Sequence, residues 1–310
     1  MKAIQPSIYS HSINLFRAAI LTTVLVAAVW AIPRTARAQM IYAASTYNSV
    51  GEYSAGGTVI NSGFITGLPN AVMSLAVSGN DVYVGTYDNI GIYNGSNGSL
   101  ITNISTSYTP WFLAVSGTNL LAACWVNSGV YDYNANTGAL ITSSFVPVNG
   151  PEGLTVVGND LYVASYSNGS VGEYNATTGA AINSSLITGL YDPMGIAVSG
   201  TDLFVATGGG GGSNDAIGEY NATTGATINA SLTTLTMPWA LDVSGNTLYA
   251  STNSGSSIYE INATSGASTG SFSVANSGLA MQSVPEPCTG AFVMGAAGLA
   301  WLVRRRAVGR

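Results

Sequence analysis

Short runs of alternating apolar and polar residues fill the chain between residues 40 and 284, and they recur with a period of about 41 residues. The run LAVSGNDVYV at residues 75–84 has two alternating segments on either side of a turn, SGND. Similar runs stand at residues 113–122, 154–163, 196–205 and 241–250. Alternation with period two predicts half-buried β-strands, and the glycine permits the positive φ of a tight turn. Each run therefore predicts a strand, a hairpin turn and a second strand.

A second pattern follows each of these runs and completes a four-stranded unit. It reads VGEYNATTGAAIN at residues 171–183 and IGEYNATTGATIN at residues 217–229. Variants of it occupy residues 90–102, 130–142 and 258–270. Asn bonds to the backbone of its own turn and the Gly adopts positive φ, so each copy predicts another hairpin. No segment of the domain has the spacing of an amphipathic helix.

The two ends of the repeat region predict how the structure closes. Residues 41–64 match strands two to four of a unit, and residues 277–284 match strand one alone. Together they supply a sixth unit and leave no open sheet edge. Four-stranded units with a period near 40 are typical of β-propellers. We predict an all-β fold, a six-bladed β-propeller closed by its N- and C-terminal strands, with five or seven blades as the alternatives.

The repeats resemble those of NHL-type six-bladed propellers. Units of that family share the pattern P-x-G-[IL]-A-V followed by LYVA, and the runs at residues 154–163 and 196–205 are similar to it. The resemblance covers nearly all of residues 40–284 and implies the fold. It does not imply a reaction, because propellers support many unrelated activities.

The first 38 residues have the organisation of a secretory signal peptide. A basic leader precedes the apolar residues 18–32, and Ala36 and Ala38 form an A-x-A cleavage site. We therefore expect residues 1–38 to be a signal peptide with its helix, removed on export. The leader is long and two arginines follow the apolar stretch, so an uncleaved N-terminal anchor is the alternative.

Residues 284–310 have three features in a fixed order. Pro285, Glu286 and Pro287 interrupt regular structure, because each proline fixes φ and lacks a donor. Residues 288–303 carry no charge and approach the length of a transmembrane helix. A basic cluster follows and favours the cytoplasmic side of a membrane; it consists of Arg304, Arg305 and Arg306.

This order resembles the PEP-CTERM sorting signal of Gram-negative, biofilm-forming bacteria, which a membrane protease of the exosortase type reads and cuts. The resemblance implies an exported precursor anchored in the inner membrane through the C-terminal helix. An exosortase-type protease is then the implied partner, and the cell surface or extracellular matrix is the implied destination. An ordinary C-terminal anchor is the alternative, since hydropathy and flanking charge would look the same.

Charge is divided sharply between the terminal segments and the domain. All eight Lys and Arg residues and His11 lie in the terminal segments, and all fourteen Asp and Glu residues lie between Gln39 and Val303. The domain lacks the cations that nucleic-acid binding needs, the base of a nucleophilic triad and the imidazole ligands of zinc. Carboxylate chemistry, oxygen-ligated metal ions and neutral recognition remain. Cys124 lies in an apolar run and is predicted to be a buried core residue.

One residue per blade enters the first strand, close to the axis of a propeller, and is a candidate for ligand binding. These residues are Met73, Trp111, Glu152, Met194, Trp239 and Ser277. Two tryptophans and a carboxylate suggest an aromatic surface that binds a neutral sugar. The alternative is that the tryptophans fill the centre of the ring as core residues. Glu152 is also the weak candidate for a metal ligand.

A second repeated position carries an acidic residue in the third strand of five blades. It is occupied by Glu52, Asp132, Glu173, Glu219 and Glu260, with Ile92 in the remaining blade. Regular repetition indicates an architectural role, because a catalytic pair needs two carboxylates in different environments. We predict that these groups face water, accept hydrogen bonds or hold Ca²⁺. The cofactor stays unassigned, since the GND and GTD turns lack the spacing of a calcium loop.

Two functional hypotheses follow. The first is a non-enzymatic, exported propeller that binds or organises extracellular polysaccharide, or binds another surface protein, with no nucleic-acid partner. The second is a lactonase-like hydrolase dependent on a divalent metal, since the resemblance to gluconolactonase-type propellers implies Glu, Asn and Asp ligands near the axis. Only Glu152 stands at an entrance position suited to that role. We predict the first and assign no catalytic residue.

Overall fold

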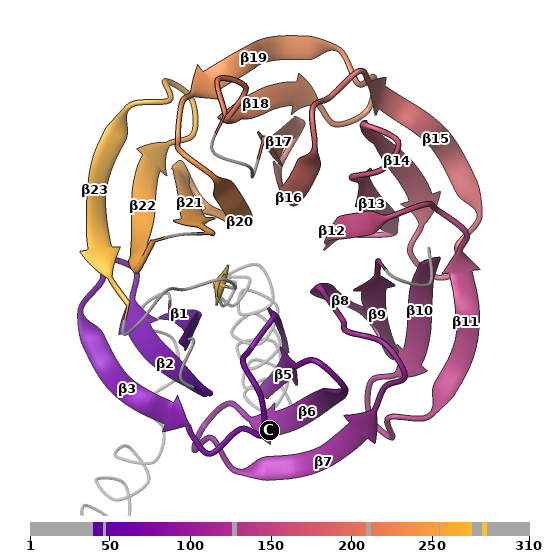
Figure 1. The fold of residues 1–310 in the computed structure, drawn as a ribbon, viewed down its shortest axis with the longest axis vertical. Helices are drawn as coiled ribbons and strands as arrows, with labels where there is room; N and C mark the ends of the chain where they lie inside the picture. The colour runs from indigo at the N-terminus through magenta and orange to yellow at the C-terminus, as the bar shows by residue number, and fades with distance from the viewer. Residues whose placement is uncertain are drawn as a thin grey trace, which may run out of the picture. The chain divides into compact units, whose positions relative to one another are not determined.

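A computed structural model describes residues 40–45, 48–125, 129–208, 212–253, 255–274 and 281–283. They form a ring of six four-stranded antiparallel sheets, which is the predicted six-bladed propeller (Figure 1). No helix in this part of the chain is long and apolar enough to cross a membrane. The predicted signal peptide and sorting tail, with Ser277, lie outside the described residues.

Five blades, B to F, are continuous in sequence, and their strands run in order from the axis to the rim (Figure 1). Blade B contains β4 (Ser74–Ser78), β5 (Asp81–Gly85), β6 (Asn89–Asn94) and β7 (Leu100–Ser105). Blade C contains β8 (Phe112–Ser116), β9 (Asn119–Cys124), β10 (Gly129–Asn134) and β11 (Leu140–Val146). Blade D contains β12 (Pro151–Val157), β13 (Asp160–Ser165), β14 (Ser170–Asn175) and β15 (Ala181–Thr188). Blade E contains β16 (Pro193–Ser199), β17 (Asp202–Thr207), β18 (Ala216–Asn221) and β19 (Thr227–Thr233). Blade F contains β20 (Pro238–Ser244), β21 (Thr247–Thr252), β22 (Ser257–Asn262) and β23 (Ser268–Ser273).

Blade A closes the ring with strands from both ends of the repeat region. It contains β1 (Met40–Ser45), β2 (Ser49–Ser54) and β3 (Val59–Ile65), while the innermost strand is β24 (Met281–Ser283). Strands β1 and β24 are antiparallel, with Ile41 opposite Ser283. The predicted closure is confirmed, and no blade has an unpaired inner strand in the described structure.

The turn between the first and second strands of each continuous blade contains a glycine with positive φ, as predicted. These glycines are Gly79, Gly117, Gly158, Gly200 and Gly245, with φ between 55° and 61°. A side chain is rarely accommodated at such φ values, so glycine is the residue that these turns require.

The turn between the third and fourth strands is organised by an asparagine. In blade D, Asn175 Oδ1 accepts hydrogen bonds from the N–H of Thr177 at 3.0 Å and of Thr178 at 2.9 Å. Gly179 follows at a φ of 70°, and a Cβ there would lie against the carbonyl oxygen of Phe145 in blade C. The turn is thus both internally bonded and packed against the neighbouring blade.

The same kind of contact repeats around the ring and also closes it. A Cβ at Gly225 of blade E would lie against the Leu186 carbonyl of blade D, and one at Gly57 of blade A would meet Phe272 of blade F. The Tyr249 hydroxyl of blade F donates to the Ala55 carbonyl of blade A at 3.2 Å. The junction between blades F and A therefore resembles the junctions inside the chain.

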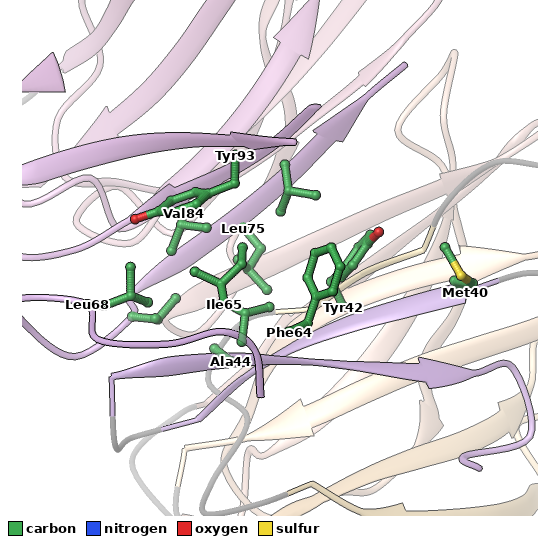
Figure 2. Close-up of a cluster of buried hydrophobic side chains, with 12 residues drawn as sticks. Met40, Tyr42, Ala44, Phe64, Ile65, Leu68, Leu75, Val84 and Tyr93 are labelled. Atoms are coloured by element: carbon green, nitrogen blue, oxygen red, sulfur yellow. The ribbon is translucent and has the colours of Figure 1, made fainter. Parts of the chain in front are cut away.

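The core lies between the blades, where facing sheets bury their side chains (Figure 2). Between blades A and B, the Tyr42 and Phe64 rings lie 5.3 Å apart and pack with Leu75 and Val84. The other face of β1 buries Ile41 against blade F. Successive residues of a strand point to opposite faces of the sheet. Alternate residues of each blade therefore pack against its two neighbouring blades.

Candidate functional site

The candidate binding residues lie at one end of the ring, which we call the entrance face, where the innermost strands begin (Figure 1). Met73 and Trp111 directly precede β4 and β8. Glu152, Met194 and Trp239 are the second residues of β12, β16 and β20. The structure therefore places five of the six candidates at equivalent positions around the axis.

Two tryptophans from opposite blades meet at the axis. Trp111 belongs to blade C and Trp239 to blade F, and their ring centroids are 6.0 Å apart. Phe112 lies 6.5 Å from Trp239 in a stacked arrangement, and Met194 packs in the same cluster. Trp239 is only 7% exposed. The rings fill the centre of the entrance end, as the core alternative predicts.

Three polar atoms in this region are buried without a hydrogen-bond partner in the described structure: Trp111 Nε1, Trp239 Nε1 and Glu152 Oε2. Each such atom costs about 1–3 kcal/mol when it is desolvated and left unpaired. Burial also raises the pKa of Glu152 to about 7, because the charged carboxylate loses hydration. Apolar side chains could fill the same space without leaving any polar atom unpaired. Packing alone therefore does not explain why polar side chains lie here.

Glycines bring the inner strands close together beside these residues. A Cβ at Gly153 would lie against the Met194 carbonyl, and a Cβ at Gly195 would lie against the Trp239 carbonyl. The absence of a side chain at both positions permits close backbone approach. Strands β12, β16 and β20 are thereby held side by side, with Glu152, Met194 and Trp239 in matching register.

The turns that lead into three inner strands share an unusual backbone conformation. Gly150, Asp192 and Met237 have φ values of 57°, 44° and 51°, each directly before the proline that begins the strand. Positive φ is strained for Met237, at about 1–2 kcal/mol. The Asp215 carboxylate accepts the Met237 N–H at 2.8 Å and fixes this turn beside Trp239.

Further aromatic side chains lie in the loops of the same face. Tyr87 and Trp125 follow the second strands of blades B and C and are 52% and 43% exposed. Tyr166 holds the corresponding place in blade D and packs against the tryptophan cluster. Tyr191, in the loop before β16, is 55% exposed. We call Tyr87, Trp125, Tyr166 and Tyr191 the entrance-loop aromatics.

The entrance-loop aromatics were not among the residues predicted from the sequence, although the repeats contain a signal for three of them. The segments GTY, ACW and ASY end at Tyr87, Trp125 and Tyr166 and follow the second strand of three successive blades. The predicted candidates came from the first and third strands of each unit, and these residues follow the second. Tyr191 has no counterpart in the other repeats, so periodicity could not reveal it.

Contact with water, acceptance of hydrogen bonds and binding of Ca²⁺ were the roles predicted for the acidic residues of the third strands, and the first does not apply to four of the five. Glu52, Asp132, Glu173 and Glu219 are all less than 10% exposed, and only Glu260 is partly exposed. The facing blades cover them, because their strand lies in the middle of a sheet buried on both sides.

Burial is also the main reason that acid pKa values are raised in these strands. It raises the pKa of Asp132 to about 6, and it raises that of Glu173, with a further contribution from the Asp160 charge. These carboxyls sit one per blade, and no group of three His, Cys, Asp or Glu residues that could hold a metal occurs in the described part of the chain. Cys124 is buried with a pKa raised to about 12, which confirms its prediction as a core residue.

Comparison with known proteins supports the fold alone. No protein-family model and no curated protein sequence matches the chain. A chain in the crystal structure of a nidogen–laminin complex aligns with 81% of this protein and 100% of its own length, at 14% identity and a TM-score of 0.66. The computationally designed protein Ika8 aligns with 78% of this chain and 74% of its own, at 15% identity and a TM-score of 0.51. Such low identities carry no information on ligand or reaction.

Proposed function

We propose that this protein is an exported, non-enzymatic β-propeller that binds extracellular polysaccharide through its entrance face, as a surface or matrix component. The observation that carries the proposal is the concentration of aromatic rings there. The paired Trp111 and Trp239 occupy the axis, and Tyr87, Trp125 and Tyr191 are exposed in the surrounding loops. Flat rings offer apolar area to the faces of sugar rings, and their polar tips bond to hydroxyl groups.

The charge of the domain indicates which polysaccharide would bind. Residues 40–284 contain Asp and Glu but no Lys, Arg or His. An acidic polymer would be repelled by this field, particularly at low ionic strength. A neutral polysaccharide avoids that repulsion and matches a surface built from Tyr, Trp, Asn, Ser and Thr. We therefore favour a neutral glycan as the ligand.

The sequence supports the route by which the protein would reach such a glycan. The signal peptide of residues 1–38 directs export, and the tail resembling PEP-CTERM signals holds the precursor in the inner membrane until an exosortase-type protease acts. Replacement of Pro285, Glu286 and Pro287 by alanine should keep the protein in the membrane fraction, whereas the unaltered chain should reach the surface or the medium. Equal release of both proteins would contradict the sorting proposal.

Glycan binding by the full chain tests the main proposal. We expect affinity for neutral glucans or mannans and little for alginate, which is acidic. Tyr191→Ala should weaken binding several-fold, because one stacking ring is worth about 1 kcal/mol or more. Ile228→Ala is the matched control, since Ile228 is 52% exposed but lies on the outer strand of blade E. Absence of binding to every glycan, or equal losses in both variants, would contradict the proposal.

The lactonase hypothesis receives no comparable support. Glu152 is the one carboxylate among the five described entrance positions, and the described residues contain no cluster of three acidic, His or Cys ligands around it. A single carboxylate does not fix a divalent ion, which takes several oxygen ligands.

A further inference from the structure

The strongest unexplained feature of the entrance face is the set of three unpaired polar atoms at the axis. Trp111 Nε1, Trp239 Nε1 and Glu152 Oε2 come from the innermost strands of blades C, F and D. Glu152 and Trp239 are only 6% and 7% exposed. Buried polar groups in proteins are nearly always paired, so three unpaired groups in one region call for a partner from outside the described chain.

We propose that these three atoms form a recognition site for one neutral, hydroxyl-rich ring, such as a single sugar residue of the bound glycan. This inference rests on the proposed function and adds the groups that contact the ligand. Each indole N–H donates a hydrogen bond to a hydroxyl oxygen, and the Glu152 carboxyl accepts one from a hydroxyl group. Met194 and Phe112, which pack with Trp239, supply the apolar sides of the site.

The donor and acceptor pattern favours a neutral ligand over an ion. A hydroxyl group both donates and accepts, so a ring with several hydroxyls can satisfy two N–H donors and one carboxyl together. An anion would be repelled by Glu152, and a cation would find two N–H dipoles directed at it. The raised pKa of Glu152, about 7, keeps a share of the carboxyl uncharged near neutral pH, which lowers the cost of burying it under a ligand.

The unpaired atoms also give the site a measurable signature. In the free protein they lower stability, because each is desolvated without a hydrogen bond. A variant that removes the unpaired group and nearly keeps the volume of the side chain, such as Glu152→Leu, should therefore fold more stably and bind more weakly. A tryptophan with a purely structural role would behave differently, since shrinking it would create a cavity and lower stability without any effect on binding.

The test compares wild type, Trp239→Phe and Glu152→Leu in the full chain, with Tyr249→Phe as the matched control. Binding of β-1,3- and β-1,4-linked glucose hexamers and of mannan oligomers is measured by calorimetry, and thermal unfolding is measured without ligand. We expect Trp239→Phe and Glu152→Leu to weaken binding about tenfold or more, the equivalent of one lost hydrogen-bonded group. The Tm of Glu152→Leu should stay level or rise by about 2–4 °C. Trp239→Phe also loses ring volume, so its Tm should fall by no more than a few degrees. Tyr249→Phe should change the affinity by less than about threefold, because the hydroxyl that it removes bonds to Ala55 at the end opposite the entrance face.

The outcomes separate this inference from the proposed function. Wild-type affinity in both Trp239→Phe and Glu152→Leu would overturn the inference alone, if Tyr191→Ala still weakens binding. A crystal structure with glycan bound, in which only water contacts the three atoms, would overturn it equally. Failure of the wild-type chain to bind any of these glycans would overturn both proposals. Weaker binding with retained stability would support the site.

Discussion

The two ends of the propeller differ in how they use repetition. At the end opposite the entrance face, an asparagine organises the turn after the third strand in all five continuous blades, and its bonds are satisfied within the turn. At the entrance face the equivalent positions carry two methionines, two tryptophans and a glutamate, so the residue changes from blade to blade: Met73, Trp111, Glu152, Met194 and Trp239. Three polar atoms of that set have no partner in the described structure. The repeated end builds the ring, and the end that varies from blade to blade is suited to recognition.

The asparagine turns also explain a feature of the sequence that suggests modification. The recurring N-A-T triplets, such as Asn221-Ala222-Thr223, match the acceptor pattern for N-glycosylation. Asn221 Oδ1 accepts hydrogen bonds from the N–H of Thr223 and Thr224 and from the Thr224 hydroxyl, at 2.9–3.1 Å. The triplet therefore recurs because the turn requires it, without any need for a glycan.

The largest expected effect comes from a turn glycine at the repeated end. Gly225→Ala would place a Cβ at a φ of 69° and against the Leu186 carbonyl, so we expect a loss of about 3 kcal/mol in the free energy of unfolding. Gly200→Ala has a similar φ but open space around it, and should cost about 1 kcal/mol. Urea unfolding measures both. Equal losses would show that contact between blades contributes nothing at this turn.

The next largest effect on the free energy of unfolding is expected at the buried acid of the entrance face, Glu152. The pKa of Glu152 is raised from 4.5 to about 7, so the folded state favours the protonated form. Below about pH 4.5 the carboxyl is protonated in both the folded and the unfolded state, and its burial carries no charge penalty. As the pH rises through 7 the free energy of unfolding falls, because the folded state must then bury a charged carboxylate. Glu152→Gln should therefore be more stable than wild type at pH 8, by up to about 3 kcal/mol, and the gain should vanish near pH 4.

The control for this series is Ile228→Ala, because Ile228 is exposed on the outer strand of blade E and carries no ionisable group. Its effect on the free energy of unfolding should be small and the same at each pH, within about 0.5 kcal/mol. Thermal or urea unfolding at pH 4, 6 and 8 provides the comparison. A stability difference between Glu152→Gln and wild type that does not change with pH would contradict the assignment of a buried, protonated Glu152.

A smaller effect is expected from the turn asparagine itself. Asn221→Ala removes three hydrogen bonds from an exposed turn, and water can replace part of them, so we expect a loss of about 1 kcal/mol. Asn229→Ala is the control, since Asn229 accepts only the Ser231 N–H, at 3.1 Å. A loss for Asn229→Ala as large as that for Asn221→Ala would mean that the turn bonds are not what stabilises this end.

The smallest effect on stability should come from the entrance-loop aromatics. Tyr191 is 55% exposed, so Tyr191→Ala should change the free energy of unfolding by less than about 0.5 kcal/mol. The same variant is the one expected to weaken glycan binding. Chemical unfolding and a binding titration on one preparation would show whether the two properties are separable. A large loss of stability would place Tyr191 in the framework instead of the binding surface.

The fold could be predicted because its causes are periodic. The alternation in runs such as residues 196–205 gives the strands, and Gly200 gives the turn between them. The partial units at residues 41–64 and 277–284 are complementary, which predicts that they share a blade, and the pairing of β1 with β24 confirms it. Each inference needs only local patterns and the principle that sheet edges are paired.

The site could be predicted only in part, because its details depend on contacts between blades. The alignment on turn glycines located Trp111 and Trp239, but their meeting across the axis follows from the number of blades and the side-chain conformations. The unpaired Glu152 Oε2 is a property of burial, which sequence alone does not reveal. The burial of Glu52 and Asp132 likewise depends on how the blades pack, because acidic residues usually face water and their sequence alone left that alternative open.

Closure of blade A has a consequence for the order of folding. Strand β1 is among the first residues of the domain to leave the ribosome, and its partner β24 is the last, with Ile41 opposite Ser283. Pairing between such distant segments adds a large loop-closure entropy, which slows folding. Blades B to F can form from local hairpins, whereas β1 of blade A stays unpaired on its inner side until β24 is available. We expect the ring to close in a late step of folding. Removal of residues 281–283 should leave a nearly complete propeller in which β1 has an unpaired edge that promotes aggregation.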